Sequence, residues 1–413
     1  MDLIIKNIKE LLMTEDKPRE FVAGADMSTF KRIQNAWLTI EGEKIAGFGP
    51  MKDIPKVNCQ ELDASGKLVL PAFCDSHTHL VYAGSREIEY TDKIRGLSYE
   101  EIAKRGGGIN NSAKKLRQTS EDELYEQALE RINEIISKGT GAVEIKSGYG
   151  LEPESELKML RVIRRLKETT AVQIKSTFLG AHSVPLEYKG RQSEYVDLVI
   201  NTMLPRVAEE GLADFVDVFC DRGFFTVDET DKILKAASKY GMIPKIHANE
   251  LDFSGGIQIG VQNRARSVDH LEFTGDEEIE SLLNSKTMPT ILPGAAFFLG
   301  MDWAPARKMI ESGLPVALAS DYNPGSSPSG DMKFIFSLAC ICLKMLPEEA
   351  LQAITLNSAY AMGLEKELGT ITIGKRANLI ITKEVPGLEF LPYAYGSNLI
   401  DSTILNGKLK TEN

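Results

Sequence analysis

Between Lys67 and about Glu365 the chain alternates short, β-branched apolar runs with longer stretches of helical period. The strand candidates are residues 67–75, 141–147, 171–181, 213–221, 243–250, 267–273, 288–294 and 315–321. Such alternation is typical of a parallel sheet built from strand–helix units. Eight units predict an α/β fold, a closed (β/α)8 TIM-like barrel. A doubly wound open sheet is the alternative, although no GxGxxG motif follows a strand.

Helical segments separate these strands. In residues 120–139, Ser120 and Glu123 have the spacing of a capping box, and an apolar stripe precedes Gly139. Residues 153–168 and 228–241 show the same periodicity. We therefore expect helices on the outside of the barrel.

The two ends of the chain differ from its middle. Residues 1–66 hold short alternating segments with turn signals, and residues 367–413 return to that style. We expect these ends to pair as one small β-sandwich domain beside a barrel domain of residues 67–366.

Charge and cysteine content exclude several classes of protein. The 48 basic and 59 acidic residues give a net charge of -11, which argues against a general nucleic-acid surface. The five cysteines are scattered without a CxxC motif, so neither a disulfide framework nor a thiolate zinc site is indicated. No apolar run is long enough to span a bilayer, and the N-terminus lacks a cleavage pattern. We expect a cytoplasmic protein that acts on a small molecule, without a nucleic-acid or membrane partner.

His77 and His79 follow Asp75 at the end of the first strand candidate, in a chain with only five histidines. Residues two apart on a strand project to the same face, so both imidazoles could reach one ion at the mouth of a barrel. The alternative is a pair of hydrogen-bonded surface histidines.

The other histidines favour the metal site. His182, His247, His270 and Asp321 all fall at or near the C-terminal ends of strand candidates, which lie on one rim of a barrel. Three imidazole nitrogens and one carboxylate oxygen make a site suited to zinc or iron, with a position left for water.

The blocks DSHTH, KIHANE, VDHLEF and LASDYNPG together resemble the amidohydrolase superfamily of metal-dependent hydrolases, as does the terminal GTITIGKRANLI. More narrowly, YEEIAKRGGGI, EIKSGYGL, TFLGAHSVP, DVFCDRGFF and DYNPGSS resemble the imidazolonepropionase family. The resemblance covers nearly the whole chain. It implies hydrolysis of the cyclic amide bond of 4-imidazolone-5-propanoate to N-formimidoyl-L-glutamate, in histidine degradation.

The resemblance also implies one divalent or trivalent metal ion per chain, Zn²⁺ or Fe³⁺. The implied ligands are His77, His79, His247 and Asp321. The implied substrate contacts are Arg86, Tyr99, Tyr149, His182, Asn323, Gly325 and Ser326. The predicted catalytic residues are Glu250, His270 and Asp321.

The chemistry follows from these residue types. A bound cation lowers the pKa of water from about 15.7 to near 7, so hydroxide becomes available to attack the ring carbonyl. We favour Glu250 as the base and His270 as oxyanion stabiliser or proton shuttle, an order that the sequence leaves open. Glu250 could instead orient a ligand. Arg86 offers a forked contact to the propanoate, and its alternative is pairing with Glu87 or Glu89.

Other interpretations remain. A related deaminase of heterocyclic bases would share the ligands and change the substrate pocket, and a metal-binding scaffold protein would lack turnover altogether. Lys146 or Lys175 could be the carboxylated bridge of a two-metal relative, although a paired lysine is commoner. The glycines at 106–108 predict a mobile loop over the site. A homodimer is expected only because two-fold assemblies are common.

Overall fold

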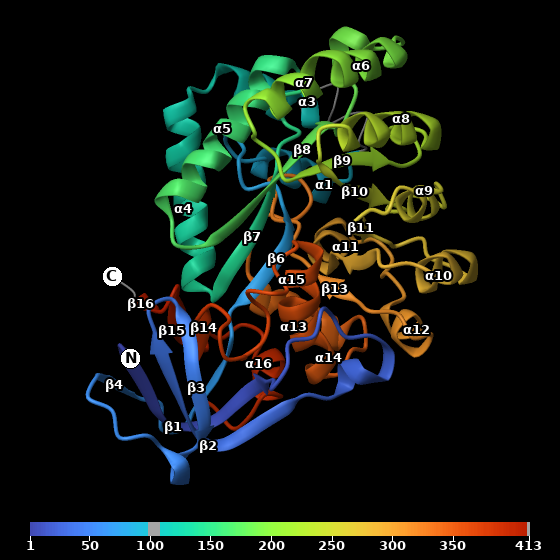
Figure 1. The fold of residues 1–413 in the computed structure, drawn as a ribbon. Helices are drawn as coiled ribbons and strands as arrows, with labels where there is room; N and C mark the ends of the chain where they lie inside the picture. The colour runs from blue at the N-terminus through green and yellow to red at the C-terminus, as the bar shows by residue number, and fades with distance from the viewer. Residues whose placement is uncertain (98–107, 411–413) are drawn as a thin grey trace.

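The computed structural model describes residues 1–97 and 108–410, which form two separate sheets (Figure 1). One sheet is parallel, with its strands in sequence order: β6 Phe73–Thr78, β7 Thr140–Lys146, β8 Gln173–Ala181, β9 Phe215–Cys220, β10 Ile243–Ala248, β11 Ser267–His270, β12 Met288–Ile291 and β13 Ala317–Leu318. A parallel bridge between Thr78 and Tyr322 joins its first strand to the segment after its last. The His79 amide donates to the Tyr322 carbonyl oxygen at 2.9 Å across this seam. The strands therefore close into the predicted barrel.

The other sheet is mixed and comes from both ends of the chain. Its strands are β1 Leu3–Thr14, β2 Lys31–Glu41, β3 Lys44–Pro50, β4 Gln60–Asp63, β5 Lys67–Pro71, β14 Leu379–Glu384, β15 Ile400–Leu405 and β16 Lys408–Lys410. Its own apolar core includes Ile5, Leu38 and Ile404. In Figure 1 the blue N-terminal strands and the red C-terminal strands lie together below the barrel. The structure thus confirms a small β unit made by both chain ends.

The first strand candidate belongs to two different strands in the structure. Within residues 67–75, β5 pairs with β1 and β14 of the mixed sheet, whereas β6 pairs with β7 of the barrel. Ala72 lies between them, and its amide donates to the Asn378 carbonyl oxygen at 2.9 Å. Periodicity could not separate these strands, because both are almost wholly buried.

Most helices connect successive barrel strands. The helices are α1 Glu87–Ile94, α3 Ile109–Gln118, α4 Glu121–Ser137, α5 Pro153–Thr169, α6 Gln192–Leu198, α7 Leu204–Glu209, α8 Val227–Ser238, α9 Gly256–Gln262, α10 Asp276–Leu283, α11 Pro293–Leu299, α12 Ala306–Glu311, α13 Met332–Ile341, α14 Pro347–Gln352, α15 Ser358–Ala361 and α16 Phe390–Tyr393. Of these, α13 to α15 follow the last barrel strand, and α16 lies between β14 and β15 of the mixed sheet. The capping box of Ser120 and Glu123 is confirmed at the start of α4. Leu124, Ala128 and Ile132 on that helix are buried in the main core. Within residues 1–97 and 108–410, none of the helices has the length and apolar character to cross a membrane.

Candidate metal centre and active site

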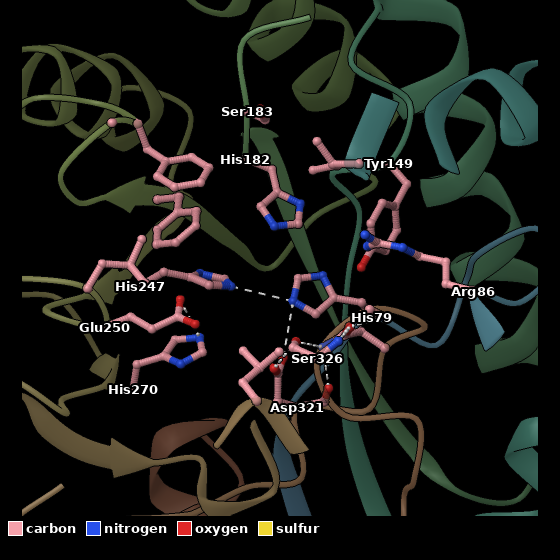
Figure 2. Close-up of a pocket in the computed structure, with 18 of the residues that line it drawn as sticks. His79, Arg86, Tyr149, His182, Ser183, His247, Glu250, His270, Asp321 and Ser326 are labelled. Atoms are coloured by element: carbon pink, nitrogen blue, oxygen red, sulfur yellow. Dashed lines mark hydrogen bonds and ion pairs between the residues drawn. The ribbon is translucent and has the colours of Figure 1, made fainter. Parts of the chain in front are cut away.

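A pocket opens at the C-terminal ends of the barrel strands, with a volume of about 570 Å³ (Figure 2). This size suits a small organic molecule. Most of the residues predicted from sequence line it: His79, Arg86, Tyr149, His182, His247, Glu250, His270, Asp321, Asn323, Gly325 and Ser326. The structure therefore brings together side chains that lie up to 247 positions apart in the chain (from His79 to Ser326).

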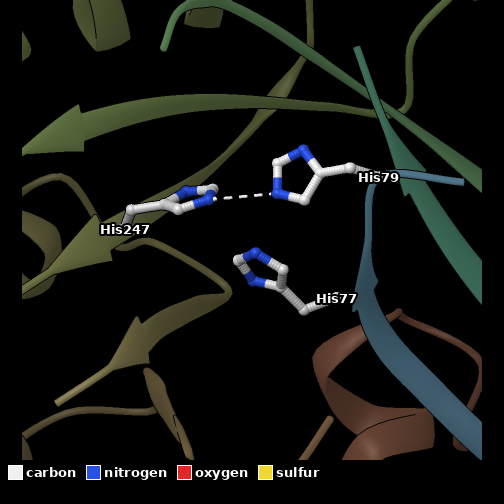
Figure 3. Close-up of side chains that lie close together, drawn as sticks. All are labelled: His77, His79 and His247. Carbon is white, nitrogen blue, oxygen red and sulfur yellow. Dashed lines mark hydrogen bonds between the residues drawn. The ribbon is translucent and has the colours of Figure 1, made fainter. Parts of the chain in front are cut away.

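Four nitrogen and oxygen atoms converge at one side of this pocket. The Nε2 atoms of His79 and His247 are 3.4 Å apart (Figure 3). Asp321 Oδ1 lies 3.6 Å from His79 Nε2 and 3.5 Å from the Nε2 atom of His77. A tetrahedral ion about 2.1 Å from each ligand has ligand–ligand separations of about 3.4 Å. These three separations match those between ligands of one metal ion, and the three histidine nitrogens lie within 4.8 Å of one another.

The chemistry of these groups also fits a metal. His77 and His79 are buried, and burial holds the pKa of each well below its usual range, so both imidazoles are neutral. His77 Nε2 is buried without a hydrogen-bond partner, which is costly unless something else takes its lone pair. A metal ion would take that lone pair. A second group of possible metal ligands consists of His77, His270 and Asp321, without His79 and His247.

Two carboxylates that sequence reasoning did not identify lie behind the histidines, and the one beside His77 is hydrogen-bonded to it. His77 Nδ1 lies 2.7 Å from Asp269 Oδ2, and His247 Nδ1 lies 3.0 Å from Asp217 Oδ2. A carboxylate on the far nitrogen of a histidine fixes its tautomer and leaves Nε2 free for a metal. The available signal was a single charge inside each apolar strand, in FVDVFC and SVDH.

The loop that follows β13 is shaped around Asp321. The Asn323 side-chain oxygen accepts from the amides of Gly325 and Ser326 at 2.7 and 2.8 Å. The Ser326 hydroxyl donates to Asp321 Oδ2 at 3.0 Å. Asn323 thus holds the turn that presents Gly325 and Ser326 to the pocket and fixes the second oxygen of Asp321.

Glu250 and His270 face each other across 3.7 Å, measured from Oε2 to Nε2. Burial raises the pKa of Glu250 to about 8, and the carboxylates of Asp321 and Asp221 add to this shift. The Asp221 carboxylate accepts from the Glu250 backbone amide at 2.7 Å, which positions the residue. The separation exceeds direct hydrogen-bond reach, so a proton could pass between the carboxyl group and the imidazole through one bridging water.

Arg86 lies on another side of the pocket, as Figure 2 shows. Its guanidinium pairs with Glu89 Oε2, from Nη2 at 2.6 Å and from Nε at 2.8 Å. Arg86 therefore makes the ion pair that was expected as the alternative to substrate binding, and it also lines the pocket. A Cβ added at Gly325 would lie 2.3 Å from Arg86 Nη1, so this glycine leaves room for the guanidinium.

Tyr149 and His182 form part of the wall beside His79. The His182 ring stacks on His79 with centroids 5.2 Å apart, and its Nδ1 lies 3.0 Å from the Gly148 carbonyl oxygen. Tyr99, together with residues 106 and 107 of the predicted glycine loop, lies outside the described residues. Gly108 precedes α3, and its amide donates to Glu89 at 3.0 Å.

The two candidate bridging lysines have other partners. Lys146 is buried, with its ammonium 2.6 Å from Glu144 and 2.8 Å from Asp217. Lys175 pairs with Asp214 at 3.2 Å. Both therefore fit the interpretation as paired lysines.

Comparisons with known proteins agree with this geometry. The model of the amidohydrolase family matches residues 68–410. The fold is similar to 5-methylcytosine deaminase from Klebsiella pneumoniae, with a TM-score of 0.76 at 16% identity over 99% of this chain and 97% of that one. It is also similar to a mutant of atrazine chlorohydrolase from Arthrobacter aurescens, with a TM-score of 0.70 at 15% identity over 100% and 95%. The barrel and the cluster of possible metal ligands at its rim thus define the class of the protein, a metal-dependent hydrolase.

Relatives that are closer in sequence narrow the class. Imidazolonepropionase of Christiangramia forsetii is 55% identical over 99% of this chain and 100% of its own length. Imidazolonepropionase of Flavobacterium johnsoniae is 53% identical over the same shares, and that of Alkaliphilus oremlandii is 41% identical over 100% and 98%. The chain belongs to the amidohydrolase family and, within it, to the imidazolonepropionases.

Proposed function

We propose that the chain hydrolyses the cyclic amide bond of 4-imidazolone-5-propanoate to give N-formimidoyl-L-glutamate, a step of histidine degradation. The relatives named imidazolonepropionase support this reaction. One observation carries the proposal for this chain's own residues. A single pocket joins a cluster of metal-ligating atoms to an arginine that can bind a carboxylate.

In this proposal one Zn²⁺ or Fe³⁺ ion is held by His77, His79, His247 and Asp321. When bound, the metal would polarise the ring carbonyl and make a water acidic enough to supply hydroxide near neutral pH. Three separations of 3.4 to 3.6 Å, from His79 to His247 and from Asp321 to His77 and His79, support these ligands.

Arg86 binds the propanoate carboxylate. Its planar fork suits a bidentate contact, and its pairing with Glu89 holds the guanidinium at the pocket wall. Tyr149 and His182 pack beside the ring, Asn323, Gly325 and Ser326 line the pocket beyond Asp321, and Tyr99 is proposed as a further contact.

Glu250 and His270 move the protons. During hydrolysis the water oxygen bonds to the ring carbonyl carbon, the C–N bond breaks, and a proton reaches the leaving nitrogen. Glu250 accepts the water proton, and His270 stabilises the oxyanion or passes the proton on. The raised pKa of Glu250, about 8, would fall toward the ionised form that a base needs when a cation binds nearby.

The test compares three substrates on folded, metal-loaded protein: 4-imidazolone-5-propanoate, its propanoate methyl ester, and cytosine. We expect kcat/KM to be highest for the free acid, with N-formimidoyl-L-glutamate identified as the product by mass spectrometry. A higher kcat/KM for cytosine would favour the deaminase interpretation. No turnover of any of them would favour a metal-binding protein without catalysis.

Three further expectations are proposals too. Domain boundaries after residues 66 and 366 are testable by limited proteolysis. A homodimer is testable by light scattering, and a cytoplasmic location by fractionation of the source cells. The frequency of two-fold assemblies supports the dimer.

A further inference from the structure

Five buried charged residues fill the barrel interior beside the histidines: Glu144, Lys146, Asp217, Lys245 and Asp269, called here the interior network. Their side chains are 0% exposed to solvent. They come from β7, β9, β10 and β11. Two ammonium groups therefore face three carboxylates in a buried environment, where each charge depends on its partners.

Lys146 occupies the centre of this network. Its Nζ lies 2.8 Å from Asp217 Oδ2 and 3.6 Å from Asp269 Oδ2. These are the same two oxygen atoms that face the Nδ1 atoms of His247 and His77. One ammonium group on β7 thus connects the carboxylates behind two proposed ligands, which come from two different strands.

The contacts of Lys245 are different. Its Nζ contacts Glu144, donates to the Ser76 carbonyl oxygen at 2.9 Å, and lies 3.9 Å from Asp269 Oδ2. Of the two lysines, Lys146 is therefore the one that contacts both carboxylates beside the histidines, Asp217 and Asp269. The carboxylates of Asp217, Glu144 and Asp269 outweigh burial and raise the pKa of Lys146, so its ammonium is charged at neutral pH.

We propose that Lys146 is a positioning residue of the metal site, which holds the carboxylates of Asp217 and Asp269 against His247 and His77. Without the ammonium, two buried carboxylates would repel each other and lose the cation that they share, and only Asp269 would keep a second one, Lys245 at 3.9 Å. They would turn away, so His77 would lose the acceptor beside its Nδ1 and His247 would lose the carboxylate 3.0 Å from its Nδ1. The inference rests on the proposed metal site and extends it to a residue that touches neither metal nor substrate.

The test is the zinc affinity of Lys146→Gln, measured at neutral pH by competition with a chromophoric chelator. Loss of a group that orients a metal ligand typically weakens binding by about 10- to 100-fold, and we expect a loss in this range. An unchanged affinity would overturn the inference. Failure of the wild-type protein to bind zinc or iron would overturn the metal site itself, and the inference with it.

Lys175→Gln is the matched control. It removes one ammonium from an ion pair with Asp214, on a strand of the same barrel, where the lysine side chain is 25% exposed. We expect zinc affinity within about twofold of wild type, because a partly exposed pair contributes little. An equal loss in both variants would show a general effect of charge and overturn the inference.

Unfolding temperatures separate positioning from simple support of the fold. A purely structural role would lower the unfolding temperatures of the metal-free and zinc-loaded protein equally. A positioning role reduces the gap between them, since ligand stabilisation depends on affinity. If Lys146→Gln does not fold, Asp217→Asn keeps the size of the side chain and removes the carboxylate charge that pairs with Lys146 beside His247. We expect a similar loss of zinc affinity there, and wild-type affinity would overturn the inference.

Discussion

The guanidinium of Arg86 is confined by two neighbours, the Glu89 carboxylate and the backbone of Gly325. Its side chain is 15% exposed, so its pairing with Glu89 differs from that of a solvated surface arginine. At the residue scale the structure shows the pairing with Glu89 that was the alternative and places the same guanidinium at the pocket, so the binding role stays a prediction. The sequence alone could not decide between this role and simple ion pairing.

Arg86→Met should raise KM for 4-imidazolone-5-propanoate by about 10- to 100-fold, because a charge-assisted contact contributes about 1.5–3 kcal/mol. kcat should change much less if the contact is the same in substrate and transition state. Steady-state kinetics measure both. Arg95→Met, at the end of the same helix with a side chain 68% exposed, is the control. An unchanged KM in Arg86→Met would remove Arg86 from the substrate site.

Glu250→Gln should lower kcat by about 10²- to 10⁴-fold, the usual contribution of a general acid–base group. Glutamine keeps the shape but cannot accept a proton. His270→Asn should also lower kcat. The variant with the larger loss of kcat identifies the group on which proton transfer depends more. Both variants should keep the wild-type unfolding temperature.

The exposed Glu280 on α10 provides a control for the Glu250 variant. Glu280→Gln should leave kcat unchanged. Full activity in Glu250→Gln would exclude this residue as the base.

At the element scale, local sequence signals worked where neighbours in the chain decide the structure. The capping box at Ser120 and the apolar stripe of α4 lie within one helix, so the sequence was sufficient to predict them. The division at Ala72 depends on which strands pair with β5, namely β1 and β14. Those partners lie far away in the chain, so periodicity could not reveal the division.

Ser120→Ala should reduce the free energy of unfolding by about 0.5–2 kcal/mol, since the cap satisfies an amide at the start of α4. Urea unfolding followed by circular dichroism measures the change. Ser137→Ala, at the other end of the helix, removes only a hydroxyl that donates to the Glu134 carbonyl oxygen. Equal destabilisation by both would argue against a specific capping contribution.

At the scale of the whole molecule, closure of the barrel assembles the site. The five histidines and Asp321 could be placed on one rim from sequence, because all fall at or near the C-terminal ends of strand candidates. The partners of the histidines could not, because Asp217 and Asp269 contact them across strands. The interior network depends equally on register and side-chain direction. The substrate contact at Tyr99 stays a prediction.

The most direct test of the account is ultraviolet-monitored turnover of freshly made 4-imidazolone-5-propanoate, on protein whose metal content has been counted, with and without chelator. We expect rapid loss of the imidazolone with about one metal per chain. A chelator should abolish it, and added Zn²⁺ or Fe³⁺ should restore it. Undiminished turnover by folded, metal-free protein, or two metals per active chain, would contradict a mononuclear ring-opening hydrolase.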